Sequence, residues 1–310
     1  MPVCFSTSRT CGRAHLATLR IMVSRHSAFY SPLIGAIAGG FLKAEGFDAT
    51  YAVVPQGKNV GALVAAGEVE VGQSAVSGSW AAMEKGEQSP TVHFAQINER
   101  DGFYIASRRD DRSFTWDKLL HGGFMYVHGG QPQAMLAYAM HKKGVDISKV
   151  RGINAGNIDA MMGAWRGGQA DFFHEQGPYP QQLEHEAKAH VVASVGEVIG
   201  PVAFSSLTAP REWLKTPDAK RFMRAYRKAR TWVATALPRE VAAAEKSLFP
   251  TTDSGVLERT IAAYQALGCW GSGVQITQGT YDVAQEVFLH SKLITRRHPM
   301  SQVVVAPPDA

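Results

Sequence analysis

The sequence is poor in cysteine, which excludes a disulfide framework. Its 310 residues include three cysteines, Cys4, Cys11 and Cys269. An odd number at wide spacing matches neither the paired bridges of small secreted domains nor the closely spaced pairs of a zinc site. We expect Cys4 and Cys11 to lie in a flexible N-terminal tail, and Cys269, next to Trp270, to be a buried thiol rather than a nucleophile.

Long apolar runs are missing as well. No stretch approaches the roughly 18 uninterrupted apolar residues of a membrane-spanning helix, so the sequence predicts no such helix. The first 13 residues include basic side chains but no apolar core of the kind that a secretory signal needs. Taken as written, this segment predicts either a cytoplasmic protein or a start that is trimmed or misassigned.

The chain also lacks a concentrated patch of one charge. Its formal net charge is +5, but the basic residues within 108–112 sit beside Asp110 and Asp111, and those within 221–230 repeat at helical spacing. The second group is typical of a solvated helix face. Because nucleic-acid binding requires a clustered basic surface, we predict no nucleic-acid partner.

Motifs for metals and cofactors are absent too. The 11 histidines form no HExxH pair, and no glycine-rich phosphate or dinucleotide loop follows a predicted strand. The glycines between Gly35 and Gly40 fall inside a predicted helix, where they suit close packing. The segment from Asp171 to Glu175, which includes His174, is the nearest approach to a metal cluster. We predict no metal and no cofactor.

What the sequence does contain is an alternation of strand and helix patterns. With 45% hydrophobic residues, the chain is long enough for one large or two medium domains. β-Branched and aromatic runs indicate strands, and amphipathic or small-residue runs between them indicate helices. This alternation favours an α/β fold with mostly parallel sheets. Its first part predicts strands at 19–24, 49–54, 69–74, 92–97 and 102–106, and helices at 32–44 and 60–66.

A second unit of the same kind begins at about residue 108. Each of its strands leads through a polar loop into a helix. The predicted strands are 124–127, 150–153 and 170–173, and the helices are 133–143, 157–165 and 179–186. Strands at 189–194 and 202–207 follow, of which the second returns to the first unit. The rest is predicted to be helical, at 210–214, 217–237, 238–249, 254–267 and 281–289.

An ordered set of segments resembles one known family. The segments are Gly40–Phe47, Leu63–Glu70, Val71–Ala75, Gly129–Leu136, Asn154–Met162 and Gly200–Ser206. They make most of the chain similar to type 2 periplasmic solute-binding proteins of ABC transporters, in the NMT1-like branch that covers sulfonate, taurine, nitrate and thiamine-precursor binders. The resemblance implies a monomer that presents a small organic solute, anionic or aromatic, to an ABC-type permease. It also implies a periplasmic location, for which the N-terminus provides no signal.

The family's architecture sets the domain expectations. It implies two lobes, each a mostly parallel sheet flanked by helices, joined by two hinge crossings with the ligand between the lobes. We place the crossings near 106–108 and 204–206. Lobe I is then expected at 18–106 and 205–295 and lobe II at 107–204, with flexible tails at 1–17 and 296–310.

Polar loops that follow the predicted strands are the candidate ligand contacts, because such loops surround the crevice of an open α/β sheet. The first-lobe candidates are His26, Ser27, Tyr30, Lys58, Gln73, Ser74 and Ser77; the second-lobe candidates are Gly130, Gln131, Asn157, Glu175 and Gln176. Several have an ordinary structural alternative. Lys58 can be a solvated turn residue, Asn157 a helix N-cap, and Glu175 either an acceptor for an amine or a solvated carboxylate.

A cytoplasmic enzyme of the same fold is the alternative function. Desulfinases of this fold carry a cysteine nucleophile in the first strand-to-helix loop, where this chain has the segment 24–28 without cysteine. Thiamine-pyrimidine synthases require a cysteine-rich iron segment, which is also missing. Ser27 beside His26 lacks a recognisable third group to orient a nucleophile. We therefore predict no catalytic residues and favour a binding protein.

Overall fold

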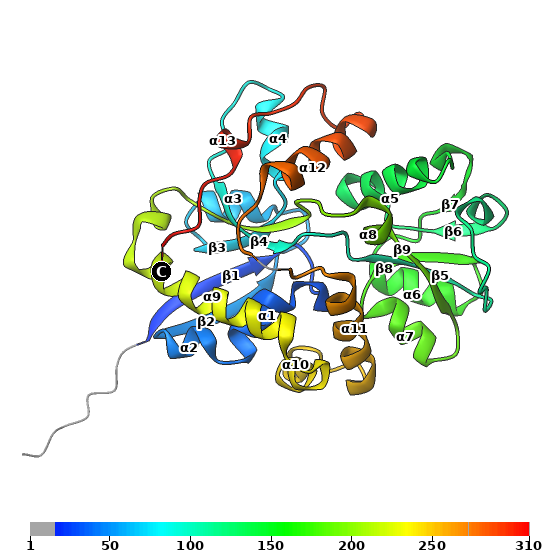
Figure 1. Ribbon diagram of the computed structural model, residues 1–310, viewed down its shortest axis with the longest axis horizontal. Coiled ribbons are helices and arrows are strands. Elements are labelled where there is room, and N and C mark those ends of the chain that lie inside the picture. The colour runs from blue at the N-terminus through cyan, green and yellow to red at the C-terminus, as the bar shows by residue number, and fades with distance from the viewer. Residues whose placement is uncertain (1–15, 272, 310) are drawn as a thin grey trace, which may run out of the picture.

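A computed structural model describes residues 16–271 and 273–309, and its strands form two separate five-stranded sheets. The first sheet, on the left of Figure 1, has the order β2 (Phe47–Val53), β1 (Ala17–Val23), β3 (Val71–Ser74), β10 (Ser205–Ala209) and β4 (Val92–Asn98). The second has the order β7 (Arg151–Ile153), β6 (Gly123–Met125), β8 (Phe172–Gln176), β5 (Phe103–Ser107) and β9 (His190–Ser194). The predicted two-lobed α/β fold is confirmed.

Both sheets are mostly parallel, with one reversed strand each. Strand β10 is antiparallel to β3 and β4, and β5 is antiparallel to β8 and β9. Each reversed strand is the first that the chain enters after it leaves the other sheet. The carboxyl ends of β1, β3 and β8 face the opposite lobe, where a ligand crevice is expected.

The two crossings between the sheets lie earlier in the sequence than predicted. The first runs from Asn98 to Phe103, because β5 pairs with β8 and β9 along its whole length. The second contains helix α8 (Val195–Ile199) and ends at Ser205. Residues 103–106 thus belong to the second sheet and not to the first, since their ladder partners lie there.

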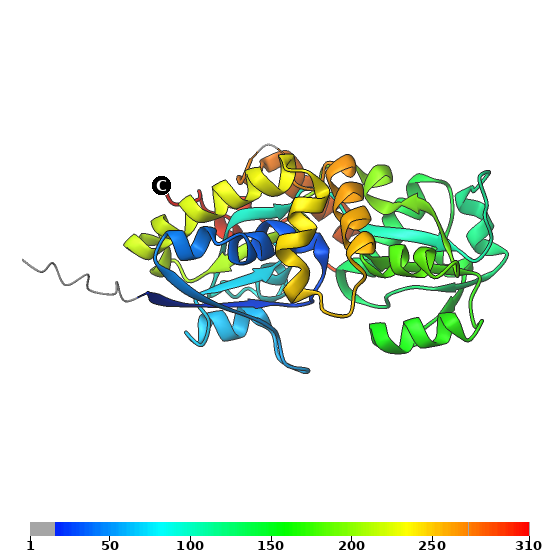
Figure 2. The ribbon, with the colours of Figure 1, turned by 90° about the horizontal axis from the view of Figure 1, so that it is seen from below.

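Helices cover both sheets (Figures 1 and 2). Around the first sheet are α1 (Ser31–Ala38), α2 (Phe41–Ala44), α3 (Val60–Ala65), α4 (Ser77–Met83), α9 (Pro217–Thr235), α10 (Pro238–Glu245) and α13 (Met300–Val303). Around the second are α5 (Gly130–Lys142), α6 (Ile158–Arg166), α7 (Tyr179–His185) and α8. Helices α11 (Ser254–Leu267) and α12 (Gln278–His290) contact both groups. The single helix predicted at 32–44 is divided, because Gly40 adopts a left-handed conformation (φ 75°).

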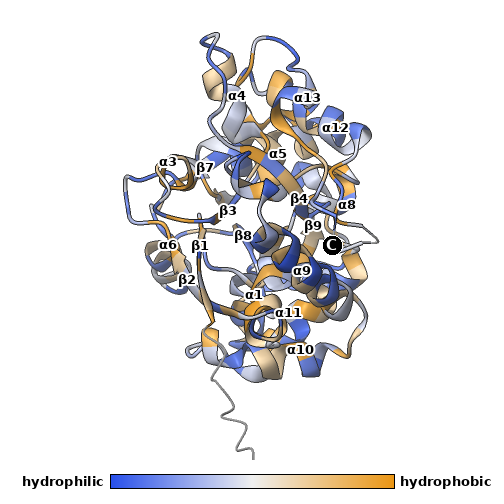
Figure 3. Ribbon diagram, turned by 90° about the vertical axis from the view of Figure 1, so that its left-hand side faces the viewer, coloured by the Kyte–Doolittle hydropathy of each residue, from blue (hydrophilic) through white to orange (hydrophobic). Residues whose placement is uncertain are grey.

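Hydrophilic and hydrophobic residues alternate along the long helix α9 (Figure 3), which is amphipathic. Its basic residues do not all lie on the solvated face. Arg224 and Lys228 lie at the solvated surface, as their helical spacing predicted, and both pair with Glu45. Arg230, in contrast, is 3% exposed and donates to the main-chain carbonyls of Gln96 and Ile97. The prediction of a wholly solvated face is wrong for this arginine, because its position on α9 faces the end of β4.

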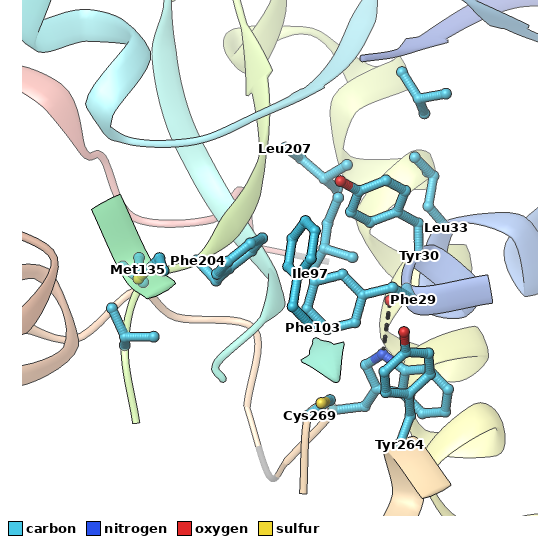
Figure 4. Packing of buried hydrophobic residues seen from close by; sticks show 14 of the residues in the cluster. Phe29, Tyr30, Leu33, Ile97, Phe103, Met135, Phe204, Leu207, Tyr264 and Cys269 are labelled. Carbon is cyan, nitrogen blue, oxygen red and sulfur yellow. Dashed lines mark hydrogen bonds between the residues drawn. The ribbon is translucent and has the colours of Figure 1, made fainter. Parts of the chain in front are cut away.

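The apolar core continues from one lobe into the other. The Phe29 ring lies 5.3 Å from that of Phe204 and 5.1 Å from that of Tyr264, measured between centroids, and Phe103 of the second sheet lies 6.3 Å from Phe204 (Figure 4). The indole nitrogen of Trp270 donates to the Phe29 carbonyl at 3.0 Å. Cys269 is fully buried beside these rings, as predicted, and burial raises its thiol pKa.

The segment after residue 296 is packed and not a free tail. It contains α13, whose Val303 is fully buried, and Val305 donates its N–H to the His93 carbonyl at 3.0 Å. Val304 forms a parallel bridge with His93 on β4. Burial of the apolar Val303 side chain favours this packing. The prolines of the segment had instead suggested a flexible tail. Cys4, Cys11 and residues 1–15 of the other expected tail lie outside the described residues.

A glycine at the crossings provides a test of their packing. A Cβ atom on Gly196 would lie 2.2 Å from the carbonyl oxygen of Asp101, and that backbone cannot move aside cheaply. We expect Gly196→Ala to lower the free energy of unfolding by about 1–3 kcal/mol, measured by urea denaturation. The control is Gly163→Ala on α6, where a Cβ meets nothing within 4 Å. Equal stability of the two variants would contradict the packing.

Candidate ligand-binding site

The end of β1 is tied to the end of β3 by one glutamine. Gln73 Oε1 accepts hydrogen bonds from the backbone N–H of Ser24, at 2.9 Å, and from its hydroxyl, at 2.7 Å. The Gln73 amide nitrogen donates to the Ser205 hydroxyl at 2.8 Å. With both ends of its amide engaged, Gln73 fixes three strand ends at the mouth of the first sheet, and it lines the cavity described below.

The facing wall comes from β5, β8 and the start of α5. Gln131, in the first turn of α5, donates its amide to the Phe204 carbonyl at 2.9 Å and so connects the second lobe to the second crossing. Gln176 ends β8 and is almost fully buried, with a side-chain oxygen that accepts no hydrogen bond among the described residues. Both side chains are therefore held close to the first lobe.

Between these walls lies a cavity of about 310 Å³. Its polar lining includes seven amide, hydroxyl or charged side chains beyond Gln73 and Ser74, and its apolar lining includes rings from both lobes. The lining residues are Ser24, Arg25, Tyr30, Val54, Lys58, Asn59, Val60, Gln73, Ser74, Ala75, Phe103, Gln131, Pro132, Gln176 and Phe204. A small polar molecule with an apolar part fits such a lining.

An ion pair joins the two lobes beneath this cavity. Arg25 follows β1 and donates through Nη1 to Glu175 Oε1, near the end of β8. Glu175 is 0% exposed, whereas the Arg25 side chain is 31% exposed and lines the cavity. Burial raises the pKa of Glu175, an effect that the Arg25 charge and the Gln176 N–H oppose. The Arg25 guanidinium also lies 5.7 Å from the Phe103 ring centroid.

Tyr30 is a further ionisable group of the cavity lining. Burial raises the pKa of its hydroxyl, although the Arg25 charge and the side chains of Gln176 and Ser24 lower it. The hydroxyl therefore stays protonated at neutral pH and can donate as well as accept. His174 stacks on the lining residue Phe103 with ring centroids 4.6 Å apart, and burial lowers the pKa of His174 to about 3, so that the imidazole is neutral.

Six of the twelve sequence-predicted residues lie together in the cavity lining: Tyr30, Lys58, Gln73, Ser74, Gln131 and Gln176. The other six lie elsewhere. Ser77 begins α4 and is half-buried, Gly130 lines a separate hollow beside α12, and Asn157 is an exposed N-cap that accepts from the Ala160 N–H at 3.0 Å. For Asn157 the structural alternative describes its position. Glu175 is buried, so the expectation of a solvated carboxylate is wrong; Arg25 compensates its charge.

His26 and Ser27 point away from the cavity. The His26 ring donates from Nε2 to the Leu248 carbonyl at 2.9 Å and accepts at Nδ1 from the Tyr51 hydroxyl at 3.1 Å. Ser27 is fully buried, and its hydroxyl donates to the Gly177 carbonyl at 2.7 Å, which links the first lobe to the second. Neither residue contacts the cavity, because the 3₁₀ turn Ala28–Tyr30 directs only Tyr30 into it.

Sequence reasoning missed Ser24, Arg25, Phe103 and Phe204 as lining residues. A signal existed for Ser24 and Arg25, since Ser24 ends the first predicted strand and Arg25 directly follows it. For Phe103 and Phe204 there was none: both read as ordinary strand residues, and only the crossings place them at the cavity.

Similarity to known proteins agrees with this architecture. Residues 28–240 match the family model described as "NMT1/THI5 like". The chain belongs to this family. The chain is also similar to "Putative binding protein YtlA" of Bacillus subtilis (strain 168), with 27% identity over 300 residues, which cover 93% of this chain and 88% of that protein.

Solved structures similar to this NMT1/THI5-like chain share its fold. The alkanesulfonate-binding protein SsuA of Xanthomonas axonopodis pv. citri, bound to MOPS, has a TM-score of 0.72 at 16% identity, covering 94% of this chain and 99% of that one. The periplasmic nitrate-binding protein NrtA of Synechocystis PCC 6803 has a TM-score of 0.68 at 13% identity, covering 93% and 86%. At these identities the likeness establishes the fold, and the predicted family is confirmed by the model match.

Two further observations concern membranes and metals. Within residues 16–271 and 273–309, none of the helices combines the length and apolarity needed to cross a bilayer. In the same residues, no three histidine, cysteine, aspartate or glutamate side chains converge as a metal ion would require.

Proposed function

We propose that this protein is the substrate-binding component of an ABC-type importer, and that its two lobes close on a small organic solute that is anionic or aromatic. The observation that carries the proposal is the cavity of about 310 Å³ at the carboxyl ends of strands from both sheets. A ligand that contacts both walls stabilises the closed arrangement of two hinged lobes.

The chemistry of the lining supports this solute class. Arg25 and Lys58 supply positive charge, while Asn59, Ser74 and Gln131 supply neutral donors on both sides. The rings of Tyr30, Phe103 and Phe204 offer flat apolar surface next to these donors. A solute with a polar or anionic end and a compact apolar body satisfies both parts of the lining.

The family relationship supports the rest of the assignment. By their names, the two similar structures are an alkanesulfonate-binding protein and a periplasmic nitrate-binding protein. We infer a permease as the partner, the periplasm as the location and a monomer as the working form. We also infer that the lobes rotate about the crossings at 99–102 and 195–204.

The geometry of His26 and Ser27 gives no support to the alternative of an enzyme that uses them. A nucleophile and its base must lie within hydrogen-bond reach of each other and of the substrate. Here the Ser27 hydroxyl donates to the Gly177 carbonyl, and both nitrogens of His26 are engaged outside the cavity.

A thermal-shift screen tests the proposed function. The purified protein is mixed with sulfonates, short and aromatic carboxylates, nitrate and pyrimidine thiamine precursors. A ligand that binds only the folded state raises the unfolding midpoint as its concentration passes Kd. We expect at least one stabilising compound, recovered unchanged when followed by mass spectrometry. Chemical conversion of a stabilising compound would overturn the binding function.

Lys58 provides a second test. Lys58 is exposed in the turn after β2 and lines the cavity. Its ammonium group therefore stays partly hydrated when it contacts a bound anion, and its contribution to affinity is modest. We expect Lys58→Ala to weaken binding of an anionic solute about three- to tenfold, measured by calorimetry. Lys85→Ala, at an exposed site beyond α4, is the matched control and should leave Kd unchanged. An identical effect in both variants would remove Lys58 from the site.

A further inference from the structure

The ion pair beneath the cavity already neutralises Arg25, one of the two cations in the cavity lining. Arg25 lines the cavity, and Glu175 lies behind it with 0% of its surface exposed. Glu175 Oε1 accepts from Arg25 Nη1 and from the Gln176 N–H, at 2.8 Å for the latter. Its second oxygen accepts no hydrogen bond within the described part of the chain. Arg25 and Glu175 together therefore carry no net charge.

Arg25 is the charged side chain that acts on Glu175, whereas Lys58, the other cation of the cavity lining, is exposed in the turn after β2. The titratable groups around Glu175 are Tyr30, Tyr179, Tyr264, its ladder partner Tyr104, and His174 next to it in sequence. Burial keeps the four tyrosine hydroxyls protonated and the His174 imidazole neutral at ordinary pH. Among the described residues Arg25 is the cation that forms a salt bridge with Glu175.

An anionic solute in contact with Arg25 would upset this neutrality. The solute anion and the fully buried Glu175 carboxylate would then share one guanidinium, and an uncompensated buried charge is strongly unfavourable. Protonation of Glu175 removes the excess: the solute anion takes the place of the carboxylate as the counter-ion of Arg25, and the carboxyl group becomes neutral. One anion and one proton enter together, and the net charge of the site is unchanged.

We propose, building on the proposed binding function, that Glu175 sets the charge of the solute that the cleft accepts, and that an anionic solute binds together with one proton taken up by Glu175. A neutral solute binds without a proton. Glu175 acts through Arg25 and does not line the cavity, so it is a specificity-determining residue rather than a direct contact.

Calorimetry with matched probes tests the proposal on the full-length protein. The probes are nitrate, methanesulfonate and dimethyl sulfone, of which the last is an uncharged analogue of methanesulfonate. Titrations in buffers of different ionisation enthalpy report the protons exchanged. Above the pKa of Glu175 we expect anion binding to take up close to one proton, and Kd to rise about tenfold per pH unit. Dimethyl sulfone should bind without proton exchange.

Glu175→Gln keeps the size of the side chain and removes its charge. We expect this variant to bind the anions about tenfold or more tightly than wild type at pH about 8, with no proton uptake and no pH dependence of Kd. The matched control is Glu245→Gln, since Glu245 is a fully buried carboxyl group that hydrogen-bonds to Ser31 outside the cavity. It should titrate anions as wild type does.

The outcomes separate this inference from the function on which it rests. Anion binding by wild type without proton uptake would overturn the inference and leave the binding function standing. Weaker binding of the anions by Glu175→Gln would also overturn it. Proton uptake by wild type supports it even where the variant does not fold. If no probe and no compound of the thermal-shift screen binds either protein, the proposed function itself fails.

Discussion

Phe29→Ala is expected to lower the free energy of unfolding by about 3–5 kcal/mol, the range for truncation of a fully buried phenylalanine. The Phe29 ring is 0% exposed and packs against Phe204 of the second crossing and Tyr264 of α11. The void left by the missing ring would remove packing contacts between the segments that connect the two lobes. Urea denaturation at neutral pH provides the measurement.

Two comparisons control this result. Phe29→Leu keeps most of the buried volume and should cost less than half as much as Phe29→Ala. Phe114→Ala removes a ring that is only partly buried, at the edge of the second lobe, and should cost less as well. If all three variants lose the same free energy, the core around Phe29 does not have the interlobe role described here.

Arg25→Ala is expected to destabilise the folded protein by about 3 kcal/mol. Removing one member of a buried ion pair leaves the other charged and unpaired, which typically costs about 3–5 kcal/mol; partial exposure of Arg25 places the expected value at the lower end. The double variant Arg25→Ala/Glu175→Gln should recover at least half of the loss. A double variant as unstable as the single one would show that packing, not charge, accounts for the effect.

The pH dependence of the same variant has a definite sign. Without Arg25 the folded-state pKa of Glu175 rises further above its unfolded value, because burial then acts unopposed. A group with a raised pKa is most favourable to folding below its unfolded pKa and loses that contribution as pH rises toward the folded pKa. The loss caused by Arg25→Ala should therefore be small in acid and grow toward neutral pH.

The sequence was most informative about where strands end. Alternating apolar runs, with polar residues after them, placed the ends of β1 and β3 and brought Tyr30 and Ser74 to one cavity. Strand β8 was predicted at 170–173 but continues to Gln176, so Glu175 and Gln176 belong to the strand and not to the loop after it. The crossings were less predictable. The run Phe103–Ser107 reads as a strand of either lobe, and only its ladder with β8 and β9 assigns it to the second.

Side-chain direction within a loop was beyond the reach of pattern reasoning. His26, Ser27 and Tyr30 all lie in one polar loop, yet a 3₁₀ turn sends only Tyr30 into the cavity. The pairing of Arg25 with Glu175 joins residues 150 positions apart, from different lobes. No local spacing predicts such a contact, since it depends on the angle at which the lobes meet.

The segment that bridges to β4 has a consequence for the behaviour of the protein at high concentration. Strand β4 is the last strand of its sheet, and an outer strand with free N–H and C=O groups is a template for pairing with another molecule. Val304 and Val305 occupy part of that outer side through their contacts with His93. The C-terminal segment thus shields the sheet from strand-to-strand aggregation, a protective role separate from any part it has in the stability of the lobe.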